Sequence, residues 1–408
     1  MTENKYFIQF GCWNQGKCDI DAGTNPVSSV MHKLREVINE EKKPEFICVA
    51  GDNYYPEKFS KKQKIIKPDN LISGFNCLPP DIEIDMIMGN HDLATNYNED
   101  HKTHYINNDT DIEPINSCFI LEQEKRQSSN NNINLVLHKS RLINRTLILM
   151  IDTTMYDDSD VNEALSCYST LLNTRPNIPT VEELRATQLE FVLRAIRENI
   201  GNFENVVIIG HHPIVGMKFK KDDQKNKIFQ PLPMFIDLLR QIYLELIESS
   251  MKYYYLCADT HLYQQGSVKI VVDSGKNMNI EQYIVGTGGT ELDNNITDNA
   301  FDNNKIDPRL RVTYTINESK EKYGFLKCNI GDEVTCEFIE ADTGTTHSSV
   351  NSENHSLTTA TTTATTATAT TRNYGGKTKK RRTTKKHSKR TKRCKRKNTK
   401  RKCSRKRL

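Results

Sequence analysis

No stretch of apolar residues in this 408-residue sequence approaches the ~20 residues that a membrane-spanning helix requires. Residues 1–10 are too short and too polar for a secretory signal, and they pass directly into an apolar run typical of a strand. Neither a membrane anchor nor a leader is therefore predicted. We expect a soluble, intracellular protein.

Recognisable cysteine patterns are also absent. The spacings of zinc fingers and of disulfide-rich scaffolds do not occur, and the number of cysteines is odd. Several cysteines lie inside apolar runs such as Phe46–Val49 and Tyr255–Cys257. We therefore expect buried, reduced thiols. The eleven residues are Cys12, Cys18, Cys48, Cys77, Cys118, Cys167, Cys257, Cys328, Cys336, Cys394 and Cys403.

Acidic residues are missing from residues 372–408, which hold 21 of the 57 lysines and arginines. The preceding residues keep 36 basic against 52 acidic side chains, a net charge of −16. Residues 357–371 are almost entirely Thr and Ala and cannot build a core. We predict a folded domain over residues 1–345, a disordered linker over 346–371 and a disordered basic tail over 372–408.

The basic tail is predicted to bind nucleic acid or another polyanion, with affinity that falls steeply as salt rises. Tyr374 is its one aromatic residue, so little base stacking and weak sequence preference are expected. A solvated tail and a nuclear-localisation signal are the alternatives. The run Tyr374–Lys377 with the basic clusters after it resembles tails on proteins of giant DNA viruses. That resemblance implies a viral protein, located in the virion or in the host nucleus or cytoplasm.

Five short stretches place residues that can bind metal ions directly after apolar, strand-like segments. A strand that ends near a glycine and delivers Asp, Asn or His puts a ligand at the edge of a sheet. Several such ends side by side can enclose two cations. Each stretch alone is a weak signal, and the five together are a strong one. They are Phe10–Trp13, Gly51–Tyr55, Gly89–Asp92, Gly210–Pro213 and Cys257–His261.

Strand and helix patterns alternate early in the chain and give way to a run of strands, which predicts an α/β fold with two packed sheets and helices outside. Polar residues 96–132 and lysine-rich residues 218–227 are expected to be loops. The predicted helices span 26–41, 180–199 and 232–249. Thr180 and Glu183 form a capping box at the start of the second helix. The predicted strands span 6–10, 46–50, 82–88, 135–138, 147–151, 206–209, 253–257, 268–272, 282–285, 310–316, 323–330 and 333–339, with 135–138 and 147–151 forming a pair.

The five stretches, in this order, resemble the calcineurin-like metallophosphoesterases and are nearest to the purple acid phosphatase branch. The resemblance covers about Tyr6 to Glu340. It implies a four-layer αββα sandwich of two mixed sheets flanked by helices. It also implies two divalent or trivalent metal ions, with Fe, Mn and Zn as candidates, and a metal-bound hydroxide that attacks a phosphomonoester.

The resemblance assigns a role to each matching residue. Asp52 would bridge the two ions, and Tyr55 and His261 would bind the first of them. Asn90 and His211 would bind the second ion. The remaining matches are catalytic: His91 would face the substrate, Asp92 would orient His91, and His212 would contact the substrate. A turn after a strand, or a structural histidine, is the alternative explanation for each.

The chain departs from the family pattern at two ligand positions. Cys12 replaces a carboxylate that binds the first ion, and Asp259 replaces an imidazole that binds the second. A thiolate can bind zinc or iron, although an ordinary buried thiol is an equal alternative for Cys12. The carboxylate of Asp259 favours harder ions such as Mn²⁺ or Mg²⁺.

Three functions are compatible with these residues. The first is a phosphomonoesterase of the purple acid type with an altered first-metal site. A second is a catalytically weakened relative that serves as a packaged or nucleic-acid-associated protein through its basic tail. The third is a phosphodiesterase or nucleotide hydrolase on the same fold, since fold does not determine substrate. Metal content and turnover of monoesters and diesters would separate the three.

Overall fold

The computed structural model of this protein describes most of the residues before residue 342. The predicted linker 346–371 and basic tail 372–408 lie outside the described residues, as does Tyr55. The described residues are 5–13, 26–53, 75, 77–93, 106–108, 111–113, 132–158, 161, 165, 168–169, 172, 177–220, 225–246, 250–273, 275–296 and 302–341.

The first of two large sheets has six strands in the order β17-β16-β1-β2-β3-β6. The four strands β1, β2, β3 and β6 run parallel, and β16 and β17 add an antiparallel edge beside β1. All residues of β2 and β3 are buried, as expected of strands in the middle of a covered sheet. The bounds are β1 Lys5–Phe10, β2 Ile47–Ala50, β3 Ile84–Ile87, β6 Ile133–Val136, β16 Gly324–Ile330 and β17 Val334–Glu340.

The second sheet has seven strands in the order β15-β13-β14-β12-β9-β8-β7. Its centre, β14-β12-β9-β8, is parallel, and antiparallel strands complete both edges. The bounds are β7 His138–Ile143, β8 Thr146–Ile151, β9 Asn205–Ile209, β12 Lys252–Cys257, β13 Tyr263–Asp273, β14 Lys276–Val285 and β15 Val312–Lys320.

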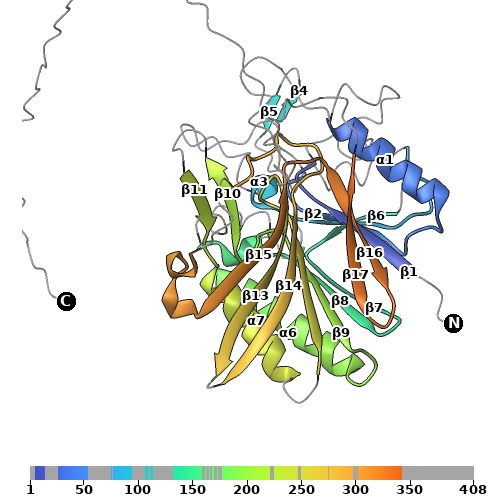
Figure 1. Cartoon of the computed structure of the whole chain (residues 1–408). Helices are drawn as coiled ribbons and strands as arrows, with labels where there is room; N and C mark the ends of the chain where they lie inside the picture. The colour runs from blue at the N-terminus through green and yellow to red at the C-terminus, as the bar shows by residue number, and fades with distance from the viewer. Residues whose placement is uncertain are drawn as a thin grey trace, which may run out of the picture. The chain divides into compact units, whose positions relative to one another are not determined.

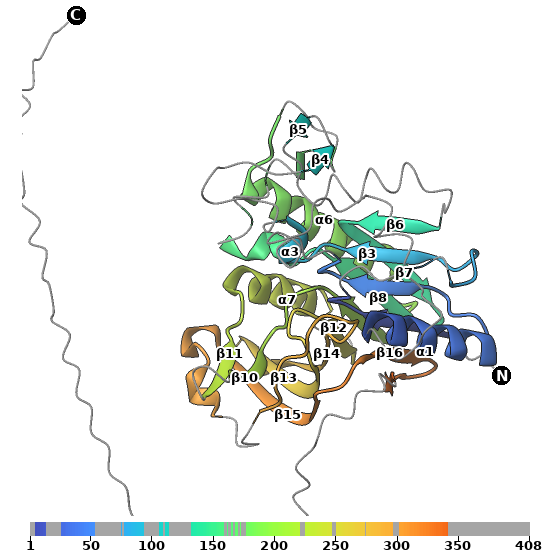
Figure 2. The same cartoon turned by 90° about the horizontal axis from the view of Figure 1, so that it is seen from above.

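Helices lie outside the two sheets, as Figures 1 and 2 show. Helix α1 (Pro26–Glu40) packs on β16, while α6 (Val181–Asn199) and α7 (Pro233–Glu245) cover the seven-stranded sheet. The predicted capping box is present: Thr180 Oγ1 accepts from Glu183 N at 3.2 Å, and Glu183 Oε2 accepts from Thr180 N at 2.7 Å. The predicted α/β fold with two mixed sheets is confirmed. No helix within the described ranges is long and apolar enough to cross a membrane.

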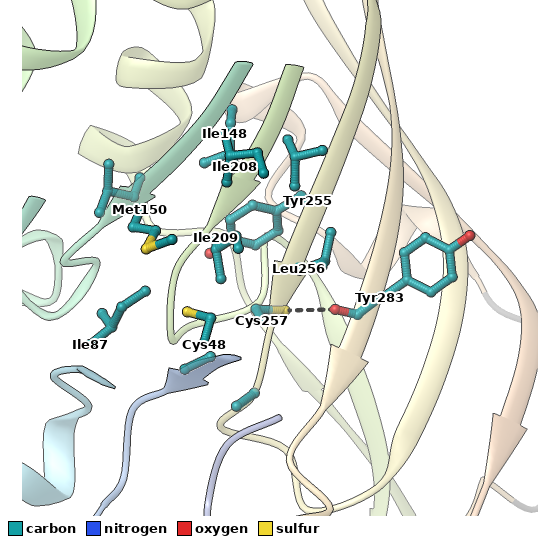
Figure 3. Close-up of a cluster of buried hydrophobic side chains, with 14 of the residues drawn as sticks. Cys48, Ile87, Ile148, Met150, Ile208, Ile209, Tyr255, Leu256, Cys257 and Tyr283 are labelled. Carbon is teal, nitrogen blue, oxygen red and sulfur yellow. Dashed lines mark hydrogen bonds between the residues drawn. The ribbon is translucent and has the colours of Figure 1, made fainter. Parts of the chain in front are cut away.

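The hydrophobic core lies between the sheets. Figure 3 shows Cys48 and Ile87 of the six-stranded sheet beside Met150, Ile209 and Cys257 of the seven-stranded sheet. All five side chains are fully buried. Because both sheets contribute to this core, the ends of their parallel strands are held in fixed positions relative to each other.

Three local predictions are wrong in part. The predicted pairing of 135–138 with 147–151 holds only for His138, because the chain changes sheets at Leu137: β6 joins β3, whereas β7, which begins at His138, pairs with β8. A continuous strand pattern does not reveal that change. The lysine-rich segment 218–227 is also not a loop throughout, since β10 (Gly216–Lys220) and β11 (Lys225–Phe229) form an antiparallel hairpin. Within 96–132, β4 (Ile106–Asn108) pairs with β5 (Asp111–Glu113).

The thiol prediction holds for Cys12, Cys48 and Cys257, which are buried and free. It is wrong for Cys77, which is disulfide-bonded, and for Cys328 and Cys336, which form a disulfide with each other. These two cysteines lie directly opposite each other in the β16–β17 register, with Cα atoms 4.1 Å apart. Only the pairing of the strands brings them together, so their spacing in the sequence gave no signal.

Candidate metal centre

Strand ends from both sheets bring six predicted ligand residues together. Strands β1, β2 and β3 end side by side in one sheet, and β9 and β12 end side by side in the other. The turns after these strands form two clusters of potential ligands, in which the ligand atoms lie within 4.8 Å of one another. The first is Cys12, Asp52 and His261; the second is Asp52, His211 and Asp259, with Asn90 beside it.

The ring of His211 shows why a cation fits the second cluster. Its Nδ1 lies 2.8 Å from the carbonyl oxygen of Ala50, which can only accept, so Nδ1 carries the proton. The lone pair of Nε2 then faces three oxygens: Asn90 Oδ1 at 3.1 Å, Asp52 Oδ1 at 3.3 Å and Asp259 Oδ1 at 3.8 Å. Four electron-rich atoms converge, and a metal ion can bind all of them.

Electrostatics supports the same conclusion. Burial lowers the pKa of His211, but the carboxylates of Asp52 and Asp259 outweigh burial and the pKa is raised. The fully buried ring therefore attracts a positive charge, either a second proton or a metal ion. A nitrogen and hard oxygen donors of this kind suit Mn²⁺, Fe or Zn²⁺.

The first cluster shares Asp52 with the second. Cys12 Sγ lies 3.8 Å from Asp52 Oδ2, whereas the other carboxylate oxygen, Oδ1, faces His211. His261 donates from Nδ1 to the carbonyl oxygen of Glu291 at 3.0 Å, which orients its ring. One oxygen of Asp52 thus faces each cluster, the arrangement expected of a bridging carboxylate.

Three of these residues have an unusual backbone. Cys12, Asp52 and Asp259 have φ angles of 54°, 52° and 57°, in the left-handed region that ordinary side chains avoid. Each follows the end of a buried strand by two residues. Such conformations cost roughly 1–3 kcal/mol each and concentrate at functional sites. These backbones place Cys12 and Asp259 in the two separate clusters that each of them shares with Asp52.

Two glycines make room for the centre. Gly51 has φ +85°, and a Cβ there would collide with the His211 ring. A Cβ on Gly89 would collide with both the backbone nitrogen and Oδ1 of Asp52. Because the obstructing atoms are ligand atoms or backbone next to them, neither position can accept a larger residue without displacing the cluster.

Asp92 joins two of the ligand-bearing turns. Its carboxylate accepts from Asn53 N at 2.9 Å, from Asn53 Nδ2 at 2.8 Å and from Gly89 N at 2.9 Å. Burial, followed by the charge of Asp52, raises the pKa of Asp92 to about 7. The backbone nitrogen of His91 donates to Asp52 Oδ1 at 3.0 Å. These bonds place Asn90 and His91 at the edge of the second cluster.

His212 is held on three sides. Thr153 Oγ1 accepts from the backbone nitrogens of His211 at 3.0 Å and His212 at 2.9 Å, and it lies 3.1 Å from His212 Nδ1. Tyr255 donates its hydroxyl to the carbonyl oxygen of His212 at 2.5 Å. The two imidazole rings are edge-on, with centroids 4.9 Å apart. His212 therefore lies next to the second cluster in a fixed orientation.

Thr153 and Asp293 were not among the predicted site residues. Thr153 had a signal, because Asp152-Thr153 follows a buried strand in the same way as the predicted ligands. Asp293 had none; it comes from a polar stretch, where its Oδ2 accepts from His261 N at 3.0 Å. Tyr55, the predicted ligand of the first ion, lies outside the described residues.

The chain matches no family model and no curated protein sequence. Comparison with solved structures gives matches at low similarity. GAP50, the anchor in the inner membrane complex of Plasmodium, is 10% identical with a TM-score of 0.47, covering 84% of this chain and 87% of that one. PhoD is 10% identical with a TM-score of 0.45, covering 83% and 70%. A novel archaeal phosphodiesterase, also 10% identical, has a TM-score of 0.21 and covers 55% and 98%. Similarities this low assign no function.

Proposed function

We propose that this protein is a metal-dependent phosphoester hydrolase with two metal ions bridged by Asp52. The observation that supports the proposal most directly is the position of Asp52, whose two oxygens face two different ligand clusters. Asp52 would hold both ions, which together would supply the positive charge for displacement at phosphorus. Its side chain is almost fully buried, so the charge needs compensation from cations.

The donor atoms divide between the two positions. Cys12 and His261 would hold the first ion, and Asn90, His211 and Asp259 the second. Tyr55 stays a proposed ligand of the first position on the family resemblance alone. When bound, the metal ions would supply the positive charge that activates water and neutralises the phosphoryl oxygens.

His212 fits the role of a neutral hydrogen-bond donor to the substrate. Two backbone N–H groups occupy the acceptor sites of the Thr153 hydroxyl, which leaves it to donate to His212 Nδ1 or to the Tyr255 hydroxyl, and we propose the bond to Nδ1. The proton of the ring is then on Nε2. Burial, and next the neighbouring His211, lower the pKa of His212 to about 4, which keeps the ring neutral. Nε2–H can therefore donate to a phosphoryl oxygen without giving up its proton.

His91 is the proposed group for the leaving oxygen. It is half-buried and follows Asn90, and its backbone is bound to the bridging carboxylate of Asp52. A side chain in that place can protonate a leaving alkoxide or stabilise charge on the phosphoryl group. We propose that Asp92 positions His91 by fixing the turn that carries it.

The finer proposal is a phosphomonoesterase resembling the purple acid phosphatases, with Fe, Mn or Zn as its metals. The motif order supports it, and the altered ligands Cys12 and Asp259 distinguish this chain from that branch. Both altered residues lie within their clusters in the structure. The donor sets therefore favour a centre that binds metal ions with altered preferences over a centre that has lost the ability to bind them.

Metal content and turnover of p-nitrophenyl phosphate test the proposal together. The wild-type protein, loaded separately with Mn²⁺, Fe²⁺, Zn²⁺ or Mg²⁺, should bind about two ions per chain and hydrolyse the ester. Asp52→Asn should lose both properties. Asp237→Asn, which changes an exposed carboxylate on α7, is the matched control and should keep both. Wild-type metal content and turnover in Asp52→Asn would refute the proposal.

A further inference from the structure

The hairpin β10–β11 gathers lysines on one of its faces. In the antiparallel register Lys218 lies opposite Lys227, and Lys220 lies opposite Lys225. Side chains two residues apart on a strand point to the same face, so all four belong to one side of the hairpin. We call it the lysine face. The opposite side includes Met217, which is buried against the core.

Placing like charges directly across a strand pair is unfavourable by itself. Opposed side chains stand about 5 Å apart at Cβ, close enough for ammonium groups to repel each other. An anion bound between them converts that repulsion into attraction. An oligophosphate bound across the lysine face would add to the compensation that Asp293 gives Lys218.

The lysine face is attached directly to the candidate metal centre. Lys218 Nζ lies 2.7 Å from Asp293 Oδ2, and the same oxygen accepts from the backbone nitrogen of His261 at 3.0 Å. The backbone of Phe219 donates to Asn294 O at 3.0 Å, which fixes the hairpin against that loop. Figure 1 shows β10 and β11 at the end of the seven-stranded sheet opposite the β13–β14 turn. One carboxylate thus separates the lysine face from a proposed metal ligand.

We propose that the lysine face binds the anionic chain of the substrate that continues beyond the phosphoryl group being cleaved, so that the preferred substrates are linear oligophosphates and their esters. This inference rests on the proposed function, since the cleaved group would lie at the metal centre. The residues of the metal centre would hold ions that offset the charge of that group, and the lysines supply separate cations for the phosphates that follow. Lysine suits this task as a mobile point charge.

The aromatic ring within the lysine face favours recognition of phosphates over recognition of a base. Lys218 and Lys227 both lie over the Phe229 ring, at 5.2 Å and 4.8 Å from its centroid. A ring that holds two ammonium groups is engaged by them and is not left open for a nucleobase. Inorganic triphosphate and ATP should therefore be comparable substrates.

The first experiment compares a long substrate with a short one. The double variant Lys220→Gln/Lys227→Gln removes two charges and leaves Lys218, which holds Asp293, in place. The ratio of kcat/KM for inorganic triphosphate to that for p-nitrophenyl phosphate should fall at least about tenfold. The matched control is Lys252→Gln/Lys276→Gln. These lysines are the first residues of β12 and β14, and the opposite ends of the two strands lie at the metal centre, so the control removes two charges far from it. Equal ratios in the two double variants would overturn the inference.

A second experiment separates this inference from the proposed function. Metal-free protein, prepared by chelation and desalting, is heated with and without inorganic triphosphate. Triphosphate should raise the Tm of the wild type and of the control more than that of Lys220→Gln/Lys227→Gln, because a ligand stabilises the state that binds it. This result would stand even if no ester were hydrolysed. Equal Tm shifts in all three proteins would refute oligophosphate binding by the lysine face, even if the protein hydrolyses p-nitrophenyl phosphate.

Discussion

The hydroxyl of Thr153 lies 2.9 Å from the backbone nitrogen of His212 and 3.1 Å from Nδ1 of the same residue. One side chain thus contacts both the backbone and the ring of His212, and we propose that it sets the tautomer of that ring. A Cβ on Gly210 would collide with Thr153 and with the Tyr255 hydroxyl. The glycine after β9 therefore allows this close packing.

Thr153→Val, which keeps the shape and removes the hydroxyl, should lower turnover by about 10–100-fold. Thr153→Ser restores the hydroxyl and should recover most of the activity. The ¹⁵N chemical shifts of His212 should report a protonated Nε2 in the wild type and in Thr153→Ser only. Identical shifts and turnover in the Val and Ser variants would show that Thr153 has no role in orienting the ring.

Buried charges also join the two sheets. Asp85, in the middle of β3, is fully buried and lies 2.8 Å from Lys139 and 2.7 Å from Arg141 on β7. Removing the Asp85 carboxylate leaves two partly buried cations paired with Glu83 alone, so Asp85→Ala should lower the free energy of unfolding by about 3 kcal/mol. Chemical denaturation measures this change. Asp81→Ala breaks an exposed pair with Lys43 and should cost less; equal losses would contradict the prediction.

Much of the candidate site could be predicted because its ligands follow strands. The apolar runs that end near Cys12, Asp52, Asn90, His211 and Asp259 predict strands, and parallel strands place their carboxyl ends together. The position of a residue directly after a strand therefore predicts that it lies at this edge of the sheets. The same logic predicted both sheets and the capped helix α6.

Other features depend on contacts that no local pattern encodes. The left-handed backbones of Cys12, Asp52 and Asp259 arise from packing, since none of these residue types requires that conformation. Asp293 reaches His261 across 32 residues of chain, and nothing around it resembles a motif. The exchange of sheets at Leu137 is likewise decided by which strand offers a free edge.

Acidification should destabilise the protein partly through His138. Burial, and next the charge of Arg194, lower the pKa of this ring in the folded state, and it packs on Phe191 at 4.3 Å. The unfolded chain therefore binds a proton more readily, and stability falls as pH drops through the usual histidine pKa of 6.5. His138→Phe removes the titration and should give a shallower loss between neutral and mildly acidic pH. Unfolding midpoints in denaturant, measured at several pH values for the wild type and for His138→Phe, give the loss of stability with pH in each protein. Identical losses in the two proteins would contradict the assignment to His138.

The basic tail should bind polyanions independently of the metal centre. With 21 lysines and arginines, residues 372–408 can release many counterions from DNA or RNA, so affinity should fall steeply with salt. The full chain and the tail peptide should be retained on DNA at low salt. A chain truncated after residue 371, at net −16, should not be retained. Equal retention of the full and truncated chains would refute a separate role for the tail.

The sulfur of Cys12 gives the first metal position a spectroscopic signature. Its Sγ lies 3.8 Å from Asp52 Oδ2 and shares a cluster with His261, a donor set of sulfur, oxygen and nitrogen that suits Zn²⁺ and Co²⁺. Protein loaded with Co²⁺ should therefore show a thiolate-to-cobalt charge-transfer band in the near ultraviolet.

Cys12→Ser should remove that band and lower the Co²⁺ content by about one ion per chain, because the second cluster contains no sulfur. Cys48→Ser is the matched control: Cys48 is also buried and free, but it belongs to neither cluster, so the band should persist. A band that survives Cys12→Ser would assign the sulfur ligand elsewhere. No band in the wild type, at full Co²⁺ loading, would make Cys12 an ordinary buried thiol beside a centre held by its oxygen and nitrogen donors.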